Sequence, residues 1–340
     1  MPVNGIDSTG SFRSSLNRRR TLQSATNTNE TAPARKLNGD LVFRYLTTFF
    51  AFSILAILAL MLFEMTAESI PSIRAFGLKF VTSSDWDAVQ ELFGALPYLY
   101  GSVVSSVLAL VLATPLSIAA ALFITEIAPQ RLGGMAAPLV ELLAAIPSVI
   151  YGLWGVLVMA PWLQSTVQPF LIEHLGFLPL FQGAPYGVSM LAAIFILMIM
   201  VVPIITSITR EVLLAVPQSQ KEAAIALGAT RWEMIKMAVL PYGRSGILGA
   251  SILGLGRAIG ETMAVTMVIG NSPNISLSLL SPAYTMPSVI ANEFAETTSK
   301  LHASALMEIG LILMVVTLIV NAMARLLIWS VSKSAKGGAA

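Results

Sequence analysis

Two charged residues, Arg257 and Glu261, stand inside an otherwise apolar stretch that runs from about residue 245 to residue 270. Roughly 20 apolar residues suffice for a helix to cross a membrane, so this stretch is long enough to span one. A charge near the middle of a span costs about 2.5–3.5 kcal/mol, and it persists where another group offsets that cost. Because the two residues are four apart, they can pair on one helix face. They form either an ion pair that fixes helix packing or a contact for a charged substrate in an aqueous pathway.

The chemistry of this pair suits an oxyanion that carries a proton. The guanidinium of Arg257 is permanently charged and offers planar pairs of donors to an oxyanion. The carboxylate of Glu261 repels an anion unless that anion donates a hydrogen bond. Phosphate near neutral pH can do so and sulfate cannot, so we hypothesise that Arg257 attracts the anion while Glu261 disfavours unprotonated ones. Thr262 and Glu141 complete the candidate substrate pathway, although Glu141 could instead lie at the membrane interface.

The most informative polar segment covers residues 216–241 and predicts two short helices. In two places a Ser or Thr precedes a glutamate by three residues, which is the spacing of a capping box. Gly228 lies where the first helix must stop, because glycine accepts the left-handed conformation. Pro241 is expected to end the second helix, which leaves a compact helical hairpin on the cytoplasmic face. The capping pairs are Ser219 with Glu222 and Thr230 with Glu233, and one face of the second helix carries Trp232, Ile235 and Val239.

The composition indicates a membrane protein. Of the 340 residues, 56% are hydrophobic and 11% are charged, whereas soluble domains carry roughly 25% charged residues. The net charge of +2 gives no support to nucleic-acid binding. The absence of cysteine excludes disulfides and thiolate metal sites. The two histidines, His174 and His302, are expected in separate loops, so we predict no metal site.

Six apolar stretches are long enough to cross a membrane, which predicts an all-α membrane protein with six transmembrane helices. Residues 1–40 are polar and predict a disordered cytoplasmic tail. Residues 41–332 would form the transmembrane domain, and 333–340 a cytoplasmic C-terminal tail. The predicted spans are about 43–65, 99–124, 136–160, 187–210, 245–270 and 305–330.

Lysine and arginine predict the orientation, since they concentrate in cytoplasmic loops. The tail and the alternate loops that follow hold most of them, so both termini are expected in the cytoplasm, with the basic tail near anionic membrane lipid. The opposite loops, about 66–98 and 271–303, are either a docking surface for a receptor or ordinary ordered loops. The basic residues on the predicted inner side are Arg13, Arg18, Arg19, Arg20, Arg35, Lys36, Arg44, Arg131, Arg210, Lys221, Arg231, Lys236, Arg244, Arg325, Lys333 and Lys336, against Arg74, Lys79 and Lys300 outside.

The polar segment resembles the EAA signature of binding-protein-dependent ABC importer permeases. The resemblance rests on Glu222-Ala223-Ala224, on Gly228 and on Leu240-Pro241, with Ala238 where the pattern usually has isoleucine. It implies that the first helix docks into a groove of a separate ATPase and couples nucleotide-driven closure to the pore. Ala223 and Ala224 would keep the docking face shallow, and Gly228 would permit the tight turn. Glu222 would either cap its own helix or pair with a cation on the ATPase.

A second resemblance covers about residues 40–332 and is to the PstC-type permeases of phosphate importers. It rests on the segments 93–97, 141–152 and 254–271. It implies that Arg257 and Glu261 take part in transport, in a bacterial inner membrane. The partners it implies are a second permease of the PstA type, an ATPase dimer of the PstB type and a phosphate-binding protein of the PstS type. ATP and Mg would bind the ATPase, with no cofactor on this chain.

Other functions fit the sequence less well. A permease for another oxyanion or small polar solute would use the same coupling loop, so only the Arg257–Glu261 context favours phosphate. An ion-driven secondary transporter usually shows internal repeats, and none is clear between the two halves. Gly254-x-Gly256 with Gly260 has the wrong spacing for a nucleotide-binding loop. The chain is therefore not expected to be an enzyme.

Overall fold

The computed structural model describes residues 38–337. The predicted tail before residue 38 and the last three residues lie outside the described part. The chain divides into two compact units, residues up to Leu60 and residues from Met61 onward, which are described separately. Apart from an isolated β-bridge between Asp87 and Leu92, the described residues form helices, turns and loops. The all-α fold class is thus confirmed.

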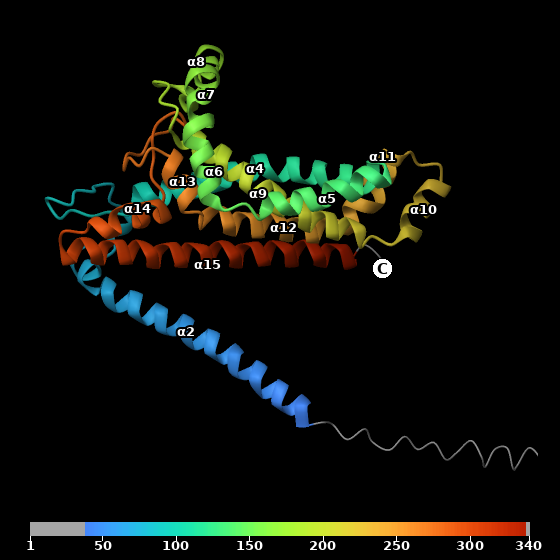
Figure 1. The fold of residues 1–340 in the computed structure, drawn as a ribbon, viewed down its shortest axis with the longest axis horizontal. Helices are drawn as coiled ribbons and strands as arrows, with labels where there is room; N and C mark the ends of the chain where they lie inside the picture. Colours follow the sequence, from blue (N-terminus) through green and yellow to red (C-terminus); the bar gives the residue numbers. More distant parts are fainter. Residues whose placement is uncertain (1–37, 338–340) are drawn as a thin grey trace, which may run out of the picture. The chain divides into compact units, whose positions relative to one another are not determined.

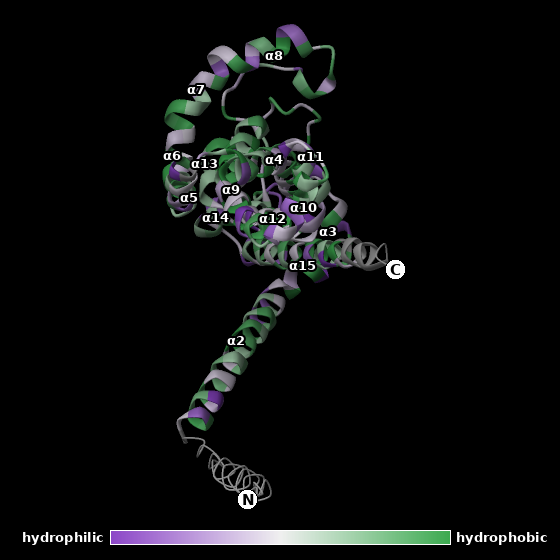
Figure 2. Cartoon of the chain, turned by 90° about the vertical axis from the view of Figure 1, so that its right-hand side faces the viewer, coloured by the Kyte–Doolittle hydropathy of each residue, from purple (hydrophilic) through white to green (hydrophobic). Residues whose placement is uncertain are grey.

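The first unit consists, where it is described, of the greater part of helix α2 (Asn38–Phe76). Its side chains between residues 39 and 60 are exposed almost without exception. Figure 2 shows α2 mostly in the green of apolar residues, and its large apolar side chains, such as Phe43, Phe52 and Leu60, are exposed. A helix that is apolar on every side is suited to a membrane or to other helices rather than to water.

The second unit is a bundle built around helix α9 (Met190–Leu214). This helix is apolar over most of its length and packs against α4 (Leu96–Leu122) and α12 (Leu240–Ile259), as Figure 1 shows. The α4–α9 contact also carries a hydrogen bond from Ser117 Oγ to the Val202 carbonyl oxygen, at 3.2 Å. Helix α15 (Lys300–Gly337) covers α12 on another side.

Small residues let these helices approach closely, as is usual for helices in membranes. A Cβ atom on Gly254 of α12 would lie 2.7 Å from Val201 Cγ1 of α9.

Residues 61–76 of α2, which belong to the second unit, are joined to α15 by hydrogen bonds. Ser304 Oγ donates to the Glu68 carbonyl oxygen at 2.7 Å and accepts from the Ser72 amide at 3.0 Å.

Five helical segments of the described residues are long and apolar enough to cross a membrane. Four of them overlap the predicted spans 43–65, 99–124, 187–210 and 305–330, and the fifth shares residues 148–160 with the predicted span 136–160. The predicted spans 136–160 and 245–270 contain helix breaks, so the predicted number of six transmembrane helices is not confirmed exactly. The five segments are Gly39–Phe76, Leu96–Ile127, Ser148–Leu175, Met190–Leu214 and Lys300–Leu326.

The span predicted at 136–160 has different boundaries in the structure. Helix α5 (Gln130–Ala144) ends before Pro147, and helical structure resumes at Ser148 and continues to Leu175. Proline disfavours helical geometry in the residue before it and has no amide to donate, which explains the break. The apolar run is continuous through this point, so hydropathy alone does not reveal it.

The span predicted at 245–270 is also broken. Helix α12 ends at Ile259, and the short helix α13 (Met263–Val268) begins after three residues. This interruption falls on Gly260, Glu261 and Thr262, which include two of the candidate pathway residues.

Candidate functional site

The break between α12 and α13 is stabilised by its own polar side chains. Glu261 is 8% exposed, and its Oε1 accepts from the amide of Ala264 at 3.4 Å, within the first turn of α13. The hydroxyl of Thr262 donates to the carbonyl oxygen of Gly260 at 3.3 Å, at the end of α12. Both bonds satisfy backbone groups that a broken helix leaves without partners. Glu261 therefore has a structural role besides any role toward a substrate.

The structure brings Arg257 and Glu261 together, but only loosely. Arg257 Nη2 lies 4.0 Å from Glu261 Oε2, which is the limit of an ion pair. The side chain of Arg257 is 41% exposed, whereas that of Glu261 is 7% exposed. A guanidinium has five donors, and this contact leaves most of them available. The guanidinium of Arg257 thus lies beside the break between α12 and α13, where it can donate further hydrogen bonds to an anion.

A second helix break lies beside the first. Helix α6 (Ser148–Trp154), which follows the break at Pro147, packs against α13. A Cβ on Gly152 of α6 would lie 3.0 Å from Ala264 Cα of α13, so the two backbones are in near contact. The hydroxyl of Tyr151 donates to the carbonyl oxygen of Leu143 at 2.8 Å, near the end of α5. Tyr151 thus stabilises this break, a role that the sequence analysis did not predict. The only feature of the sequence that could have indicated this role is the position of the tyrosine four residues after Pro147.

Glu141 is the candidate pathway residue that stands apart. It lies on α5, is exposed, and comes before the break rather than within a long apolar helix. Among the described residues, no hydrogen bond or ion pair joins its carboxylate to Arg257, Glu261 or Thr262.

The predicted stop of the first hairpin helix is confirmed. Helix α10 (Gln218–Ala226) is followed by Gly228 with a φ of +88°, the left-handed region that glycine occupies without strain. The Gly228 amide donates to the Ile225 carbonyl oxygen at 2.9 Å, and the Ala229 amide to that of Ala224 at 3.2 Å. These two bonds form a Schellman motif, which closes the helix.

One of the two predicted capping boxes is present. Thr230 accepts from the Glu233 amide at 3.3 Å and donates its own amide to Glu233 Oε2 at 2.8 Å, at the start of α11 (Arg231–Met234). The donated bonds from the Thr230 amide and hydroxyl lower the pKa of Glu233. The box predicted for Ser219 and Glu222 is wrong, because α10 already begins at Gln218 and has no side-chain cap. The carboxylate of Glu222 is consequently exposed and not occupied in capping.

The second hairpin helix does not end at Pro241, contrary to the prediction. A π-helical segment (Ile235–Val239) joins α11 to α12, so the chain is helical from Arg231 to Ile259. Pro241 lies in the first turn of α12, where proline is tolerated. The hairpin is therefore continuous with the helix that carries Arg257.

The predicted face of this helix is only partly buried. Ile235 and Val239 are 2% and 0% exposed, but Trp232 is 55% exposed. Its ring lies 5.0 Å from Lys236 Nζ, in a cation–π contact on the surface. Ile235 and Val239 belong to a buried cluster with α4 and α9, which fixes the hairpin to the bundle.

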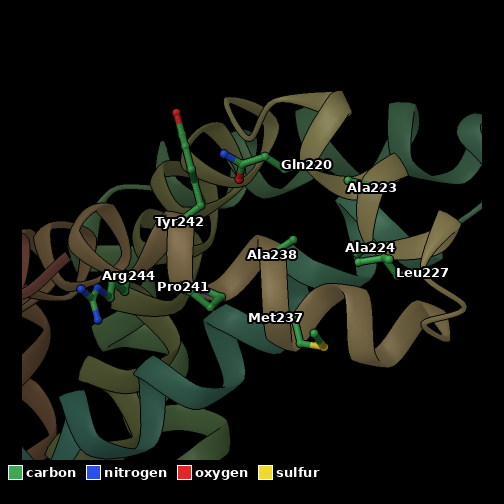
Figure 3. Close-up of a pocket in the computed structure, with 9 residues that line it drawn as sticks. All are labelled: Gln220, Ala223, Ala224, Leu227, Met237, Ala238, Pro241, Tyr242 and Arg244. Carbon is green, nitrogen blue, oxygen red and sulfur yellow. The ribbon is translucent and has the colours of Figure 1, made fainter. Parts of the chain in front are cut away.

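An open groove of about 580 Å³ separates α10 from the beginning of α12. Figure 3 shows Ala223 and Ala224 on α10, Leu227 directly after it, and Met237 and Ala238 on the facing π-helical segment. The two alanines have short side chains, so this wall of the groove is low. The groove is lined by Gln220, Ala223, Ala224, Leu227, Met237, Ala238, Pro241, Tyr242 and Arg244.

A buried ion pair connects the hairpin to the second apolar helix. Lys221 Nζ of α10 lies 2.6 Å from Glu126 Oε1, in the π-helical segment Phe123–Ile127 that follows α4. The two side chains are 13% and 7% exposed. The sequence analysis missed this pair because its members are 95 residues apart.

Known proteins with similar sequences or folds agree with this architecture. Residues 113–333 match the family described as binding-protein-dependent transport system inner membrane component. A phosphate transport system permease protein PstC of Mesorhizobium japonicum is 46% identical over 84% of this chain and 89% of the relative. The corresponding protein of Pasteurella multocida is 45% identical over 86% of this chain and 93% of its own length.

Solved structures show the same fold. A chain of a bacterial ABC transporter that imports the acidic polysaccharide alginate superposes with a TM-score of 0.57, at 16% identity, over 86% of this chain and 99% of that chain. The family match over residues 113–333 and these similar proteins agree on one family. The chain belongs to the family of binding-protein-dependent transport system inner membrane components.

Proposed function

We propose that the chain is the transmembrane permease subunit of an ATP-driven importer of inorganic phosphate and that it forms half of the translocation pathway. As a permease component it is not itself an enzyme. The relatives named phosphate transport system permease protein support the substrate. The observation that carries the proposal is the half-exposed guanidinium of Arg257, held at 4.0 Å from Glu261 beside a helix break.

Each residue of the proposed pathway has a different role. Arg257 supplies the charge that attracts the anion and the donors that hold it. Glu261 accepts a hydrogen bond only from an anion that carries a proton, so it selects phosphate over sulfate. The Thr262 hydroxyl offers a neutral contact in the same place. The role of Glu141 is to line the approach on the cytoplasmic side.

Coupling to ATP hydrolysis uses the hairpin and a separate ATPase dimer of the PstB type, which holds ATP and Mg. The exposed Glu222, the low wall of Ala223 and Ala224, and the turn at Gly228 form the docking surface. Because helical structure continues from residue 231 to 259, a displacement that passes from α10 through the turn at Gly228 reaches Arg257 without a further loop.

The assembly also contains a second permease of the PstA type and a phosphate-binding protein of the PstS type. The chain lies in the bacterial inner membrane with both termini in the cytoplasm, as the distribution of lysine and arginine indicates. The hairpin then faces the cytoplasm and the loops near α14 (Met286–Glu293) face outward.

Radiolabelled phosphate uptake by cells that express the whole assembly tests the proposal. With the wild-type chain we expect uptake that excess sulfate does not inhibit, and with Arg257→Ala we expect uptake to be lost at normal membrane insertion. Arg131→Ala, which removes an exposed arginine of α5, is the matched control. Uptake that survives Arg257→Ala would make Arg257 a packing residue, and inhibition by sulfate would indicate a broader oxyanion permease.

A further inference from the structure

A polar cavity of about 390 Å³ lies at the end of the bundle where α14 (Met286–Glu293) meets the beginning of α15. In Figure 1, α14 and the hairpin helix α10 lie at opposite ends of this unit. The loops that form the cavity include 271–303, for which the sequence left a docking role open. The cavity is lined by Ala88, Asn271, Pro273, Tyr284, Asn292, Glu293, Glu296, Thr298 and His302.

One carboxylate of the cavity, that of Glu293, is held by two ring nitrogens. Its Oε2 accepts from Trp86 Nε1 at 2.9 Å and lies 3.2 Å from His302 Nε2. A carboxylate accepts hydrogen bonds and does not donate them, so a neutral His302 carries its proton on Nε2. Its Nδ1 is then an acceptor. This atom is buried and has no partner among the described residues, in a side chain that is 5% exposed.

Other groups in the cavity wall are also acceptors. The amide nitrogen of Asn271 donates to the Thr266 carbonyl oxygen at 3.0 Å, while its Oδ1 is buried without a partner in the described part of the chain. The amide of Asn292 is occupied by the Tyr284 hydroxyl, at 2.9 Å. Glu296 adds an exposed carboxylate. The cavity therefore combines negative charge with oxygen and nitrogen acceptors that lack donors.

This lining excludes some ligands. Two carboxylates repel phosphate, so the cavity is not a stage in the path of the anion. The described residues contain no group of three or more His, Cys, Asp or Glu side chains that could hold a metal ion. The complementary ligand is a cation with several donors, such as a guanidinium or an ammonium group.

We propose that the cavity receives an arginine or lysine side chain of the docked phosphate-binding protein. This inference rests on the proposed function, because the orientation that places the cavity outside the cell comes from it. A basic side chain in the cavity neutralises the carboxylates of Glu293 and Glu296 when the two proteins meet. Contacts of this kind fix the register of a docked partner and make its binding depend on salt.

The test measures the affinity of the purified phosphate-binding protein for the complete transporter in lipid nanodiscs, at low and high salt. Glu296→Gln is the decisive variant, because no hydrogen bond ties this exposed residue to the fold in the described structure. We expect its Kd to rise about ten-fold at low salt, and that of Glu296→Lys to rise further. Glu173→Gln, an exposed acid on α8 (Gln168–Leu175) that does not line the cavity, is the matched control and should leave the Kd within about two-fold, because water and salt screen a charge outside the contact.

The variants should also lose part of the salt dependence that the wild type shows. Basal ATP hydrolysis without the binding protein should not change, which shows that the assembly is intact. A Kd for Glu296→Gln and Glu296→Lys that equals the Glu173→Gln control would overturn the proposal.

Failure of the cavity proposal is distinguishable from failure of the proposed function. Phosphate uptake by wild-type transporter at saturating binding protein tests the function alone. If the wild type imports phosphate while the Glu296 variants keep the wild-type Kd, only the cavity proposal is lost. If the wild type imports no phosphate, the function is lost.

Discussion

Two ion pairs of the second unit, Lys221–Glu126 and Arg257–Glu261, differ in almost every respect. Lys221 and Glu126 lie 2.6 Å apart with side chains 13% and 7% exposed, and they come from distant parts of the sequence. Arg257, in the last turn of α12, and Glu261, in the break that follows, lie 4.0 Å apart, with the arginine 41% exposed. The two carboxylates are equally buried, so the difference lies in the cation.

This difference separates a structural pair from a pair that can bind a ligand. A buried cation in close contact with a carboxylate has its charge compensated and no room for another anion. A half-exposed guanidinium at the limit of contact keeps donors for a ligand. We infer that Lys221–Glu126 holds the coupling helix α10 in place, while Arg257 serves the substrate.

The largest effect is expected from Lys221→Met, which leaves Glu126 buried without its cation. Removing one member of a buried pair destabilises a protein by about 3–5 kcal/mol. We expect a large fall in the unfolding temperature in detergent and the loss of ATP-driven phosphate uptake, because α10 is no longer held. Thermal unfolding and uptake by the assembled transporter measure the two effects.

The double variant Lys221→Met with Glu126→Gln is the control for this prediction. It removes both charges, and replacing a whole buried pair by uncharged groups is often nearly neutral for stability. Stability should therefore return toward the wild-type value. A single variant as stable as the wild type would contradict the assignment of a structural role to the pair.

The next effect in size is expected from Arg257→Lys, which keeps the charge but removes the planar pair of donors. Hydrogen bonds to charged groups contribute about 1.5–3 kcal/mol, so uptake at low phosphate should fall roughly ten- to a hundred-fold. Stability should change little, because the pair with Glu261 is loose. A variant that loses stability but keeps its affinity for phosphate would show that Arg257 fixes helix packing instead.

The sequence predicts best those features that depend on neighbouring residues. The stop at Gly228 and the box of Thr230 with Glu233 were both predictable, because a few consecutive residues supply the donors and acceptors. The contact between Arg257 and Glu261 was predictable from helical spacing, although the helix ends between them.

The features that the sequence does not reveal depend on distant residues. The Lys221–Glu126 pair forms only because α10 packs beside the end of α4. The break at residues 260–262 is accompanied by a close contact between α13 and α6, which come from distant parts of the chain, and the surrounding apolar sequence gives no sign of it. Hydropathy detects apolar length, and it does not distinguish one helix from two.

A smaller effect, on selectivity rather than rate, is expected from Glu261→Gln. Glutamine keeps an oxygen that can accept from the Ala264 amide, so the break should remain intact. The loss of the negative charge should let an unprotonated anion approach Arg257. We expect phosphate uptake to stay within a few-fold, roughly what a single neutral hydrogen bond contributes, while sulfate begins to compete. Unchanged selectivity for phosphate over sulfate would exclude this role for Glu261.

The smallest effect is expected from Glu211→Gln, which breaks a third ion pair. Arg210 Nη1 and Glu211 Oε1 are 2.6 Å apart, the same distance as in the Lys221–Glu126 pair, but Glu211 is 66% exposed. Water and salt screen such pairs, which contribute about 0–1 kcal/mol. The unfolding temperature and uptake should therefore match the wild type. If Glu211→Gln were as destabilising as Lys221→Met, distance rather than burial would govern the strength of these pairs, and the exposure of Arg257 would no longer distinguish a binding role from a structural one.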